Sequence, residues 1–381
     1  MRPFSFHPGP RILSGPARAP ELSASLPEGT VLFVTDAEVR RLGLVEPCLR
    51  ALEEGGRAVV LFDAVEADPS RATLLEAVQA GRSAGACSVV GFGGGSPMDV
   101  AKLAAYLLGS GDDLDSIWGV GNARGRRLPL ALVPTTAGTG SEATPVAVIT
   151  VEGAEKRGVN SPALIADWAL LDAELTVGMP RSLTAATGID AIVHAVEAYT
   201  SAKAKNPLSD LYAREALRLL SGNLLAACEQ PQNRDARSAM LLGAHLAGLA
   251  FANAPVAGVH ALAYPLGGIH HLPHGLSNAL MLRHVLAFNA EAARENYAEL
   301  AEVLDPGSAA LGSQARAALL IERLDALVTA SGLAPRLRDH GVAFDEAPLL
   351  AAEAMKQQRL LVNNPVEITQ VDAQRLYEAA W

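Results

Sequence analysis

Short apolar runs alternate with amphipathic segments along the first half of the chain. The runs have the length of strands, whereas the segments between them place apolar residues three or four positions apart, as helices do. This alternation is typical of βαβ units, in which helices cover a parallel sheet. The pattern predicts helices over residues 37–54 and 70–84, and strands at residues 31–35, 58–62, 88–91, 130–133, 146–151 and 169–171.

The second half of the chain shows a different pattern. The strand-like runs stop near Pro180, and helical spacing follows, with one helix beginning at Asn206-Pro207 and another predicted over 313–331. Ordinary core packing explains the apolar stripes of both helices. We therefore predict an α/β domain with a parallel sheet over residues 1–179 and an all-helical domain over residues 180–381. Two domains are also the expected number for 381 residues, at roughly 150 residues per domain.

One stretch of the helical half carries no charge. From Ser238 to Leu282 there is no Asp, Glu, Lys or Arg. Five of the nine histidines of the chain lie here: His245, His260, His270, His271 and His274. A membrane span is one explanation, since about 18 uncharged apolar residues can cross a bilayer. Prolines and glycines interrupt the stretch, however, and no basic cluster flanks it, so buried helices around a polar pocket are the favoured explanation.

Composition narrows the class of protein. The chain carries 31 Lys and Arg against 41 Asp and Glu, a formal net charge of −10, without a basic block. This balance argues against nucleic-acid binding, which needs a basic surface. The three scattered cysteines indicate a reducing compartment. The proline-rich segment up to Pro20 lacks the apolar core of a signal peptide, so the cytoplasm is the expected location.

A glycine-rich loop follows the strand predicted at residues 88–91. It reads Gly93-Gly94-Gly95-Ser96, and Ser96 and Asp99 have the spacing of a capping box, with Pro97 suited to the first position of a helix. The free N–H groups and the dipole of a helix N-terminus attract phosphate. Phosphate binding is therefore favoured over a turn that binds nothing, although the ordinary GxGxxG fingerprint is absent.

A second polar loop follows the strand predicted at residues 130–133. Its hydroxyl groups could hold phosphate or ribose oxygens, although a polar turn without a ligand is an equal alternative. The hydroxyls belong to Thr135, Thr136, Thr139 and Ser141. Asp36, at the end of the first strand, could accept hydrogen bonds from a ribose diol, which favours NAD over NADP. It could equally well cap the helix that follows.

Acidic and histidine side chains recur at helical spacing. Asp190 and His194 lie four residues apart in a predicted helix and so share one face. A buried acid needs a partner, which is either a metal ion or a hydrogen bond to this histidine. His260 and His274 lie in the uncharged stretch, where a single histidine would more often be a satisfied core group. Three imidazoles and one carboxylate together suit Zn²⁺ or Fe²⁺.

Four motifs in this order resemble the iron-containing (group III) alcohol dehydrogenase family. They are GGGSPMDVAK (93–102), PTTAGTGSE (134–142), GIDAIVHAVEAY (188–199) and VHALAYPLGG…LPHG (259–275). The resemblance extends over essentially the whole chain. It implies a dehydroquinate-synthase-like fold, with an N-terminal nucleotide domain, a helical metal- and substrate-binding domain, and a cleft between them. It further implies a homodimer that oxidises an alcohol reversibly to an aldehyde or ketone with NAD or NADP.

The resemblance also implies roles for individual residues. Asp190, His194, His260 and His274 would bind one divalent metal, iron or zinc, which acts as a Lewis acid on the alcohol oxygen. The dinucleotide would contact Asp36, Gly93, Gly94, Gly95, Ser96, Asp99, Thr135, Thr136, Thr139 and Ser141. Lys156 lies where family members have a lysine near the nicotinamide. The maleylacetate reductase branch is disfavoured, because its members typically lack the full metal set.

One position departs from the family pattern. Many members carry a histidine implicated in proton transfer four residues after the equivalent of His260, where this chain has Tyr264. We hypothesise that Tyr264 or His270 takes part in the proton path or shapes the substrate pocket. Simple packing of Tyr264 is the alternative.

Two other functions stay open. The first is a polyol or sugar-phosphate dehydrogenase on the same fold. Its phosphate form would need a basic residue in the pocket, and the uncharged stretch offers none. The second is a catalytically silent subunit that binds nucleotide, against which the complete metal set argues.

Overall fold

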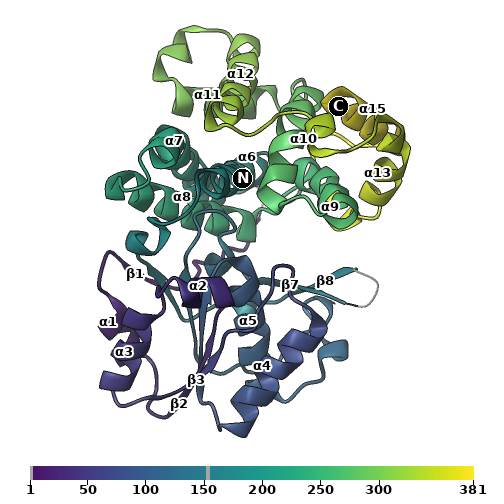
Figure 1. The fold of residues 1–381 in the computed structure, drawn as a ribbon. Helices are drawn as coiled ribbons and strands as arrows, with labels where there is room; N and C mark the ends of the chain where they lie inside the picture. Colours follow the sequence, from purple (N-terminus) through teal and green to yellow (C-terminus); the bar gives the residue numbers. More distant parts are fainter. Residues whose placement is uncertain (1–2, 152–154) are drawn as a thin grey trace. The chain divides into compact units, whose positions relative to one another are not determined.

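The computed structural model describes residues 3–151 and 155–381. The chain divides into two compact units, of which one spans Pro8–Val177 and the other spans Gly178–Trp381 together with the residues up to His7. The first is an α/β unit built on a parallel sheet, and the second is helical, as the sequence predicts (Figure 1).

The α/β unit is built on a parallel sheet that contains six strands among the described residues. Five of them lie at or near predicted positions, whereas the edge strand β1 was not predicted. In spatial order they are β1 (Arg11–Ser14), β9 (Trp168–Leu171), β6 (Leu130–Pro134), β4 (Ser88–Gly93), β2 (Thr30–Val34) and β3 (Ala58–Phe62). The predicted strand at 146–151 does not join this sheet. It forms β7 (Val146–Thr150), which pairs antiparallel with β8 (Lys156–Asn160) in a smaller sheet that also contains β5 (Gly119–Val120).

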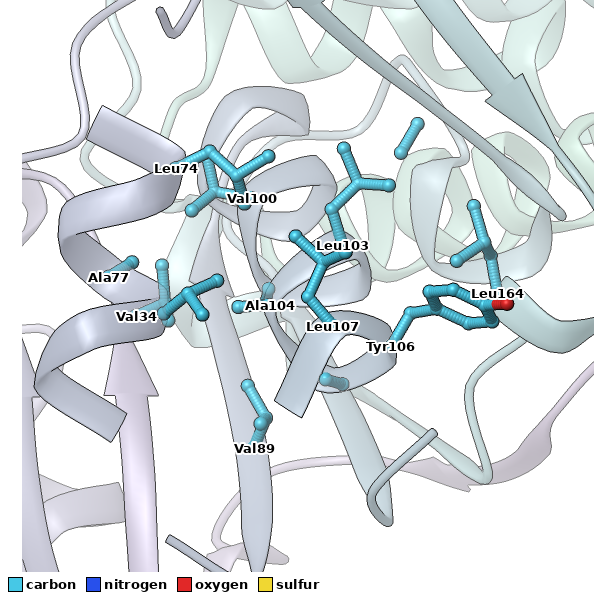
Figure 2. Packing of buried hydrophobic residues seen from close by; sticks show 14 of the residues in the cluster. Val34, Leu74, Ala77, Val89, Val100, Leu103, Ala104, Tyr106, Leu107 and Leu164 are labelled. Carbon is cyan, nitrogen blue, oxygen red and sulfur yellow. The ribbon is translucent and has the colours of Figure 1, made fainter. Parts of the chain in front are cut away.

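Alternation along the central strands divides their side chains between two helical layers. Val31 and Phe33 of β2 pack with α1 (Ala19–Ser25) and α3 (Glu46–Glu54) on one face. Leu32 and Val34 pack on the other face with α4 (Arg71–Ser83) and α5 (Gly95–Ser110). Figure 2 shows side chains of this second cluster. Both faces of the sheet are therefore buried, which explains why its strands are continuous apolar runs rather than alternating ones.

The helix predicted over residues 37–54 is two helices. α2 (Ala37–Arg41) ends before Gly43, which has a left-handed φ of 71°, and α3 begins with Pro47 in its first turn. Glycine adopts this conformation without a steric penalty, and proline lacks the N–H that a continuous helix would need at its position. The apolar periodicity continues through the break, which is why the pattern alone suggested one helix.

The helical unit is organised around α6 (Arg181–Thr200), which is buried along most of its length. The helices that pack around it are α7 (Pro207–Glu229), α8 (Arg234–Asn253), α10 (His274–Asn289) and α12 (Ser313–Ser331). The remaining α-helices are α9 (Gly258–His270), α11 (Arg294–Leu304), α13 (Ala347–Ala354), α14 (Gln358–Leu361) and α15 (Gln370–Ala380). The uncharged stretch forms most of α8, all of α9 and the first half of α10. Most of the stretch is buried, which disfavours charged side chains there, although the residues from Gly268 to His274 are exposed or half-buried.

The helices of the uncharged stretch bear on the alternative that it spans a membrane. Among the described residues, no single helix is both long and apolar enough to span a bilayer. α8 and α9 meet the length and composition criteria only as a pair, and a bend of 106° separates them.

Candidate active site

Four predicted side chains meet in the helical unit. Asp190 and His194 come from successive turns of α6, His260 from the first turn of α9, and His274 from the first residue of α10. Asp190 Oδ1 lies 3.9 Å from His194 Nε2, 3.7 Å from His260 Nε2 and 3.5 Å from His274 Nε2. One donor atom from each of the four residues lies within 4.8 Å of all the others. The structure thus brings together the whole predicted metal set.

A close approach of two helices makes this meeting possible. Gly275 lies where α10 begins against α6, and a Cβ atom on it would lie only 2.2 Å from the carbonyl oxygen of Ala186. Only glycine allows backbone contact this close. Ala186 precedes Asp190 by one helical turn, and His274 is the neighbour of Gly275. The close backbone contact therefore places the His274 side chain beside the Asp190 carboxylate.

The spacing of the four donors fits a single divalent cation. Ligand bonds of about 2.1 Å in a tetrahedral arrangement place the donors about 3.4 Å apart, close to the carboxylate–imidazole distances of 3.5–3.9 Å. These distances are too long for the alternative, a hydrogen bond between Asp190 and His194. His260 Nε2 is buried and has no hydrogen-bond partner among the described residues. A buried nitrogen without a hydrogen-bond partner lowers the stability of the fold, but its lone pair is available to bind a cation.

Asp190 is buried, with an exposed fraction of 2%. Burial alone would raise the pKa of its carboxyl, but the three histidines and a hydrogen bond from Asn278 outweigh burial, and the pKa lies below its ordinary value. Asn278 Nδ2 donates to Asp190 Oδ1 at 2.6 Å. The sequence interpretation missed Asn278, although it lies one helical turn after His274 on the same helix.

Glu197 is a second residue that the sequence interpretation missed. Its side chain is buried and accepts hydrogen bonds from the backbone N–H groups of Ala257 at 2.9 Å and Val259 at 2.6 Å. Its Oε2 also lies 2.6 Å from His260 Nδ1. A signal for it existed, since positions 190, 194 and 197 share one face of a helix.

Aromatic side chains border the four donors. The ring of Phe251 stacks on His194 with 4.3 Å between the ring centroids, and Tyr264 lies edge-on to His274 at 6.0 Å. Arg359 of α14 donates to the Tyr264 hydroxyl at 3.3 Å, with its guanidinium carbon 5.8 Å from the centre of the tyrosine ring. Tyr264 therefore borders the site, and a cation from outside the uncharged stretch accompanies it.

His270 lies at the opposite end of α9 from His260. Ten residues separate them, which is about 15 Å along a helix axis. His270 Nε2 lies 3.4 Å from Glu346 Oε2, so its closest charged partner belongs to another segment. The structure does not bring His270 into the group of four, and its part in a proton path stays a prediction.

The predicted nucleotide-binding residues lie largely at one edge of the parallel sheet. β4 and β6 are neighbours, with Gly93 opposite Pro134, and the Thr135 N–H donates to the Gly93 carbonyl at 2.9 Å. A Cβ atom on Gly95 would lie 3.1 Å from the side chain of Thr139, and one on Gly94 would lie 3.7 Å from that of Thr136. The two predicted loops therefore form one surface at the carboxyl ends of adjacent strands, where open α/β sheets bind ligands.

Asp36 lies beside the first of these glycines. Its Oδ1 accepts a hydrogen bond from the Val39 N–H at 2.8 Å, so the helix-cap interpretation is confirmed. Its Oδ2 would lie 3.2 Å from a Cβ atom on Gly93, and Pro97 would lie 2.8 Å from that atom. The φ of Gly93 is 147°, so both its conformation and its surroundings require glycine.

The predicted capping box at Ser96 is wrong. α5 begins two residues earlier, with Gly94 as its N-cap, and among the described residues no side chain caps it. Asp99 instead accepts hydrogen bonds from Ser141 Oγ at 2.6 Å and from the Val148 N–H at 2.9 Å. The Asp99 carboxylate therefore binds groups distant in the sequence instead of the backbone of Ser96, as a capping box would require.

Lys102 completes this buried network. Its ammonium donates to Ser141 Oγ at 2.7 Å and to the Val146 carbonyl at 2.7 Å, and lies 3.6 Å from Asp99 Oδ1. Burial raises the pKa of Asp99 and lowers the pKa of Lys102. Asp99 and Ser141 thus join α5 to the strand β7, and their contact with a dinucleotide stays a prediction.

Lys156, the last of the predicted cofactor residues, lies in β8. Its ammonium is 2.6 Å from Asp68 Oδ1 in a half-exposed ion pair. This pair ties the small sheet to the loop before α4. Its position relative to a nicotinamide is not tested by these contacts.

Both halves of the chain match known protein families. Residues 9–173 match the family described as "Iron-containing alcohol dehydrogenase", and residues 184–381 match "Fe-containing alcohol dehydrogenase family, C-terminal". Among curated relatives, long-chain-alcohol dehydrogenase 1 of Geobacillus thermodenitrificans (strain NG80-2) is 39% identical over 354 residues, which cover 92% of this chain and 89% of the relative.

Solved structures give the same result. A 1,3-propanediol oxidoreductase is 34% identical with a TM-score of 0.96, and the match covers 100% of both chains. A sulfoacetaldehyde reductase from Bifidobacterium kashiwanohense, solved in complex with NAD+, is 27% identical with a TM-score of 0.89, covering 100% of this chain and 99% of that one. With its four motifs, its gathered histidines and matches to both halves, the chain belongs to the iron-containing alcohol dehydrogenase family.

Proposed function

We propose that this enzyme interconverts an alcohol with its aldehyde or ketone, using NAD and one divalent cation held by Asp190, His194, His260 and His274. The observation that carries the proposal is the position of Asp190 Oδ1, which is buried and lies 3.5–3.9 Å from three imidazole nitrogens, of which those of His194 and His260 belong to buried residues. Iron and zinc both accept this donor set.

The bound cation would supply Lewis acidity, which would favour loss of the proton from the alcohol oxygen and of a hydride from the carbon that bears it, with the nicotinamide as hydride acceptor. The protein supplies the surroundings. Asp190 provides one negative charge against the cation, and Phe251 shields one face of His194 from water. A dry setting strengthens every electrostatic interaction within it. The hydroxyl of Tyr264, held by Arg359, is the proposed group for exchanging the substrate proton with solvent.

The nucleotide is proposed to bind the α/β domain predicted over residues 1–179, and metal and substrate are proposed to bind the helical domain predicted over residues 180–381. The first turn of α5 offers backbone N–H groups to the pyrophosphate, together with the positive end of the helix dipole. Asp36 Oδ2 beside Gly93 would accept from a ribose diol and repel a 2′-phosphate, which favours NAD over NADP. We also infer a cytoplasmic homodimer, the location from the unpaired cysteines and the dimer from family resemblance.

Chelation tests the proposal. We expect exhaustive removal of divalent metal to abolish NADH-linked turnover across a panel of alcohols and aldehydes, while NADH still binds. Added Fe²⁺ or Zn²⁺ should restore turnover and identify the metal that serves. Full turnover after complete metal removal would contradict the proposal.

Arg359 supports a narrower candidate, an aldehyde or alcohol that carries an anionic group. The uncharged stretch offers no cation, but α14 brings a guanidinium to Tyr264 at the edge of the site. No described carboxylate lies within ion-pair distance of it, so its charge is available to a substrate. The related sulfoacetaldehyde reductase has a name that denotes such a substrate.

A matched pair of substrates tests this candidate. A charge-assisted hydrogen bond contributes about 1.5–3 kcal/mol, so Arg359→Gln should lower kcat/KM for 4-oxobutanoate about tenfold to a hundredfold. The same variant should change kcat/KM for butanal much less. Equal losses for both substrates would favour the alternative, in which Arg359 only positions Tyr264.

A further inference from the structure

We propose that Glu197 is a positioning residue that selects the tautomer of His260 and so leaves Nε2 of that histidine free to bind a cation. The inference rests on the proposed metal site and adds to it a residue that is not itself one of the four proposed ligands. Its basis is the arrangement of donors and acceptors around one buried carboxylate.

The described hydrogen bonds of the Glu197 side chain run from α6 to the start of α9. The Val259 N–H donates to Oε1 at 2.6 Å, and the Ala257 N–H donates to Oε2 at 2.9 Å. Oε2 also lies 2.6 Å from His260 Nδ1. Glu197 has an exposed fraction of 3% and His260 has the same. Water is therefore a poor competitor for any of these hydrogen bonds.

The chemistry of these groups determines where the imidazole proton lies. A carboxylate offers acceptors only, so a contact of 2.6 Å with Nδ1 requires Nδ1 to carry a hydrogen. In a neutral imidazole the other nitrogen then keeps its lone pair. That nitrogen, Nε2, is 3.7 Å from Asp190 Oδ1 and has no hydrogen-bond partner among the described residues. The tautomer set by Glu197 is therefore the one that a metal requires.

The two backbone contacts make the carboxylate a rigid reference. Ala257 and Val259 flank the first residue of α9, where N–H groups lack partners within the helix. The positive end of the helix dipole there stabilises a buried negative charge. Because the same carboxylate holds the start of α9 and the imidazole that follows it, the orientation of His260 relative to α6 is fixed at three points.

A glutamine cannot reproduce this arrangement. Its amide has one oxygen and one NH₂ group, so one of the two carboxylate positions becomes a donor. If the NH₂ faces Val259, two N–H groups oppose each other at the start of α9. If it faces His260, the imidazole must accept at Nδ1 and carry its proton on Nε2, which blocks metal binding. A residue that only capped the helix would lack this second consequence.

The test compares Glu197→Gln with a control that also removes a helix cap. Asn206 caps α7 by accepting from the Ser209 N–H at 3.0 Å, so Asn206→Ala disturbs the start of a helix that contributes none of the four donor residues. Zn²⁺ affinity of the metal-free proteins would be measured by competition with a chromophoric chelator, and the visible spectrum with bound Co²⁺ would report the donor geometry. Melting temperatures of the metal-free proteins would report folding.

We expect Glu197→Gln to weaken Zn²⁺ binding tenfold to a hundredfold and to alter the Co²⁺ spectrum, as the loss of a group that orients a metal-binding histidine does. Asn206→Ala should lower the melting temperature and leave both metal readouts unchanged. Glu197→Asp, which keeps an acceptor-only side chain, should bind Zn²⁺ more tightly than Glu197→Gln.

Wild-type Zn²⁺ affinity in Glu197→Gln would overturn the inference, as would equal affinities in the Gln and Asp variants. The Asp variant also serves if the Gln variant fails to fold, because its Co²⁺ spectrum should then resemble that of the wild type. Failure of the wild-type protein itself to bind Zn²⁺ or Co²⁺ would overturn the proposed metal site instead. The two failures are therefore distinguishable.

Discussion

Two buried polar clusters in this protein have opposite characters. In the α/β unit, Lys102, Asp99 and Ser141 satisfy one another, since the ammonium has three hydrogen-bond acceptors and the carboxylate accepts from Ser141 and from a backbone N–H. In the helical unit, Asp190 faces three imidazole nitrogens at distances too long for hydrogen bonds, and His260 Nε2 has no hydrogen-bond partner among the described residues. The first cluster is complete as it stands, whereas a cation is proposed to complete the second.

This difference separates a role in stability from a role in binding. A buried network whose donors and acceptors match stabilises the fold and gains nothing from a ligand. A buried group whose acceptors face one another is costly until a cation joins them. The contrast predicts that removing a member of the first cluster lowers stability, and that removing a member of the second lowers metal binding.

The largest expected effect is on turnover. Asp190→Asn keeps the volume of the side chain, and its oxygen can still accept the hydrogen bond from Asn278, so the metal-free protein should lose no more than about 1 kcal/mol of unfolding free energy. Loss of the anionic ligand should reduce NADH-linked turnover about a thousandfold, equivalent to several kcal/mol. Turnover within tenfold of the wild type would contradict the proposal that the cluster around Asp190 binds a cation needed for activity.

Lys102→Met tests the other cluster. It leaves the Asp99 carboxylate buried without its ammonium, which should lower the unfolding free energy by about 3–5 kcal/mol. Zn²⁺ affinity should stay at the wild-type level. Chemical denaturation of the metal-free protein measures the first quantity, and chelator competition the second. A variant that is stable but binds Zn²⁺ weakly would contradict the assignment.

The pH dependence of this loss has a definite sign. Burial already raises the pKa of Asp99, so the folded state binds more protons than the unfolded state above the unfolded pKa, and this contribution to stability falls as pH rises. Removing Lys102 raises the pKa of Asp99 further. The stability deficit of Lys102→Met should therefore be larger at pH 8 than at pH 5, where Asp99 takes up a proton more readily.

A steric change at the helix contact should have a smaller effect. Gly275→Ala puts a methyl group 2.2 Å from the Ala186 carbonyl oxygen, so α10 must shift away from α6. We expect a loss of about 1–3 kcal/mol of unfolding free energy, together with weaker Zn²⁺ binding as His274 moves. Gly268→Ala, on a helix position with open space around it, provides the control.

The smallest predicted change concerns the nucleotide. Asn caps helices about as well as Asp, so Asp36→Asn should leave the melting temperature nearly unchanged. The loss of the negative charge beside Gly93 should raise kcat/KM for NADPH relative to NADH about tenfold, or about 1.4 kcal/mol. An unchanged cofactor ratio would limit Asp36 to its confirmed role as a cap.

Local pattern made most of the fold predictable. Helical spacing indicated Asp190 and His194, whereas the uncharged stretch holds five histidines, from which the family resemblance selects His260 and His274. Buried parallel strands are recognisable in the sequence as continuous apolar runs. The edge strand β1 has a weaker signal because it is only four residues long and mostly exposed. The break between α2 and α3 has a weaker signal because the apolar periodicity continues through it.

The tertiary partners of Asp99 and Tyr264 could not be identified from local sequence patterns. The spacing of Asp99 predicts a local hydrogen bond within a capping box. Its carboxylate instead accepts from the N–H of Val148, which lies 49 positions away in the chain. Arg359 lies 95 positions from Tyr264, so the uncharged stretch alone suggested a pocket without a cation. Local spacing cannot report which distant donor reaches a buried acceptor, because packing decides it.

Metal stoichiometry tests the central claim most directly. Titration of the metal-free protein with Co²⁺, followed by visible absorption, should saturate at one equivalent per chain, and Asp190→Asn should lose the tight phase while Lys102→Met keeps it. A wild-type protein that shows no saturable binding, or an Asp190→Asn variant that titrates like the wild type, would contradict the account.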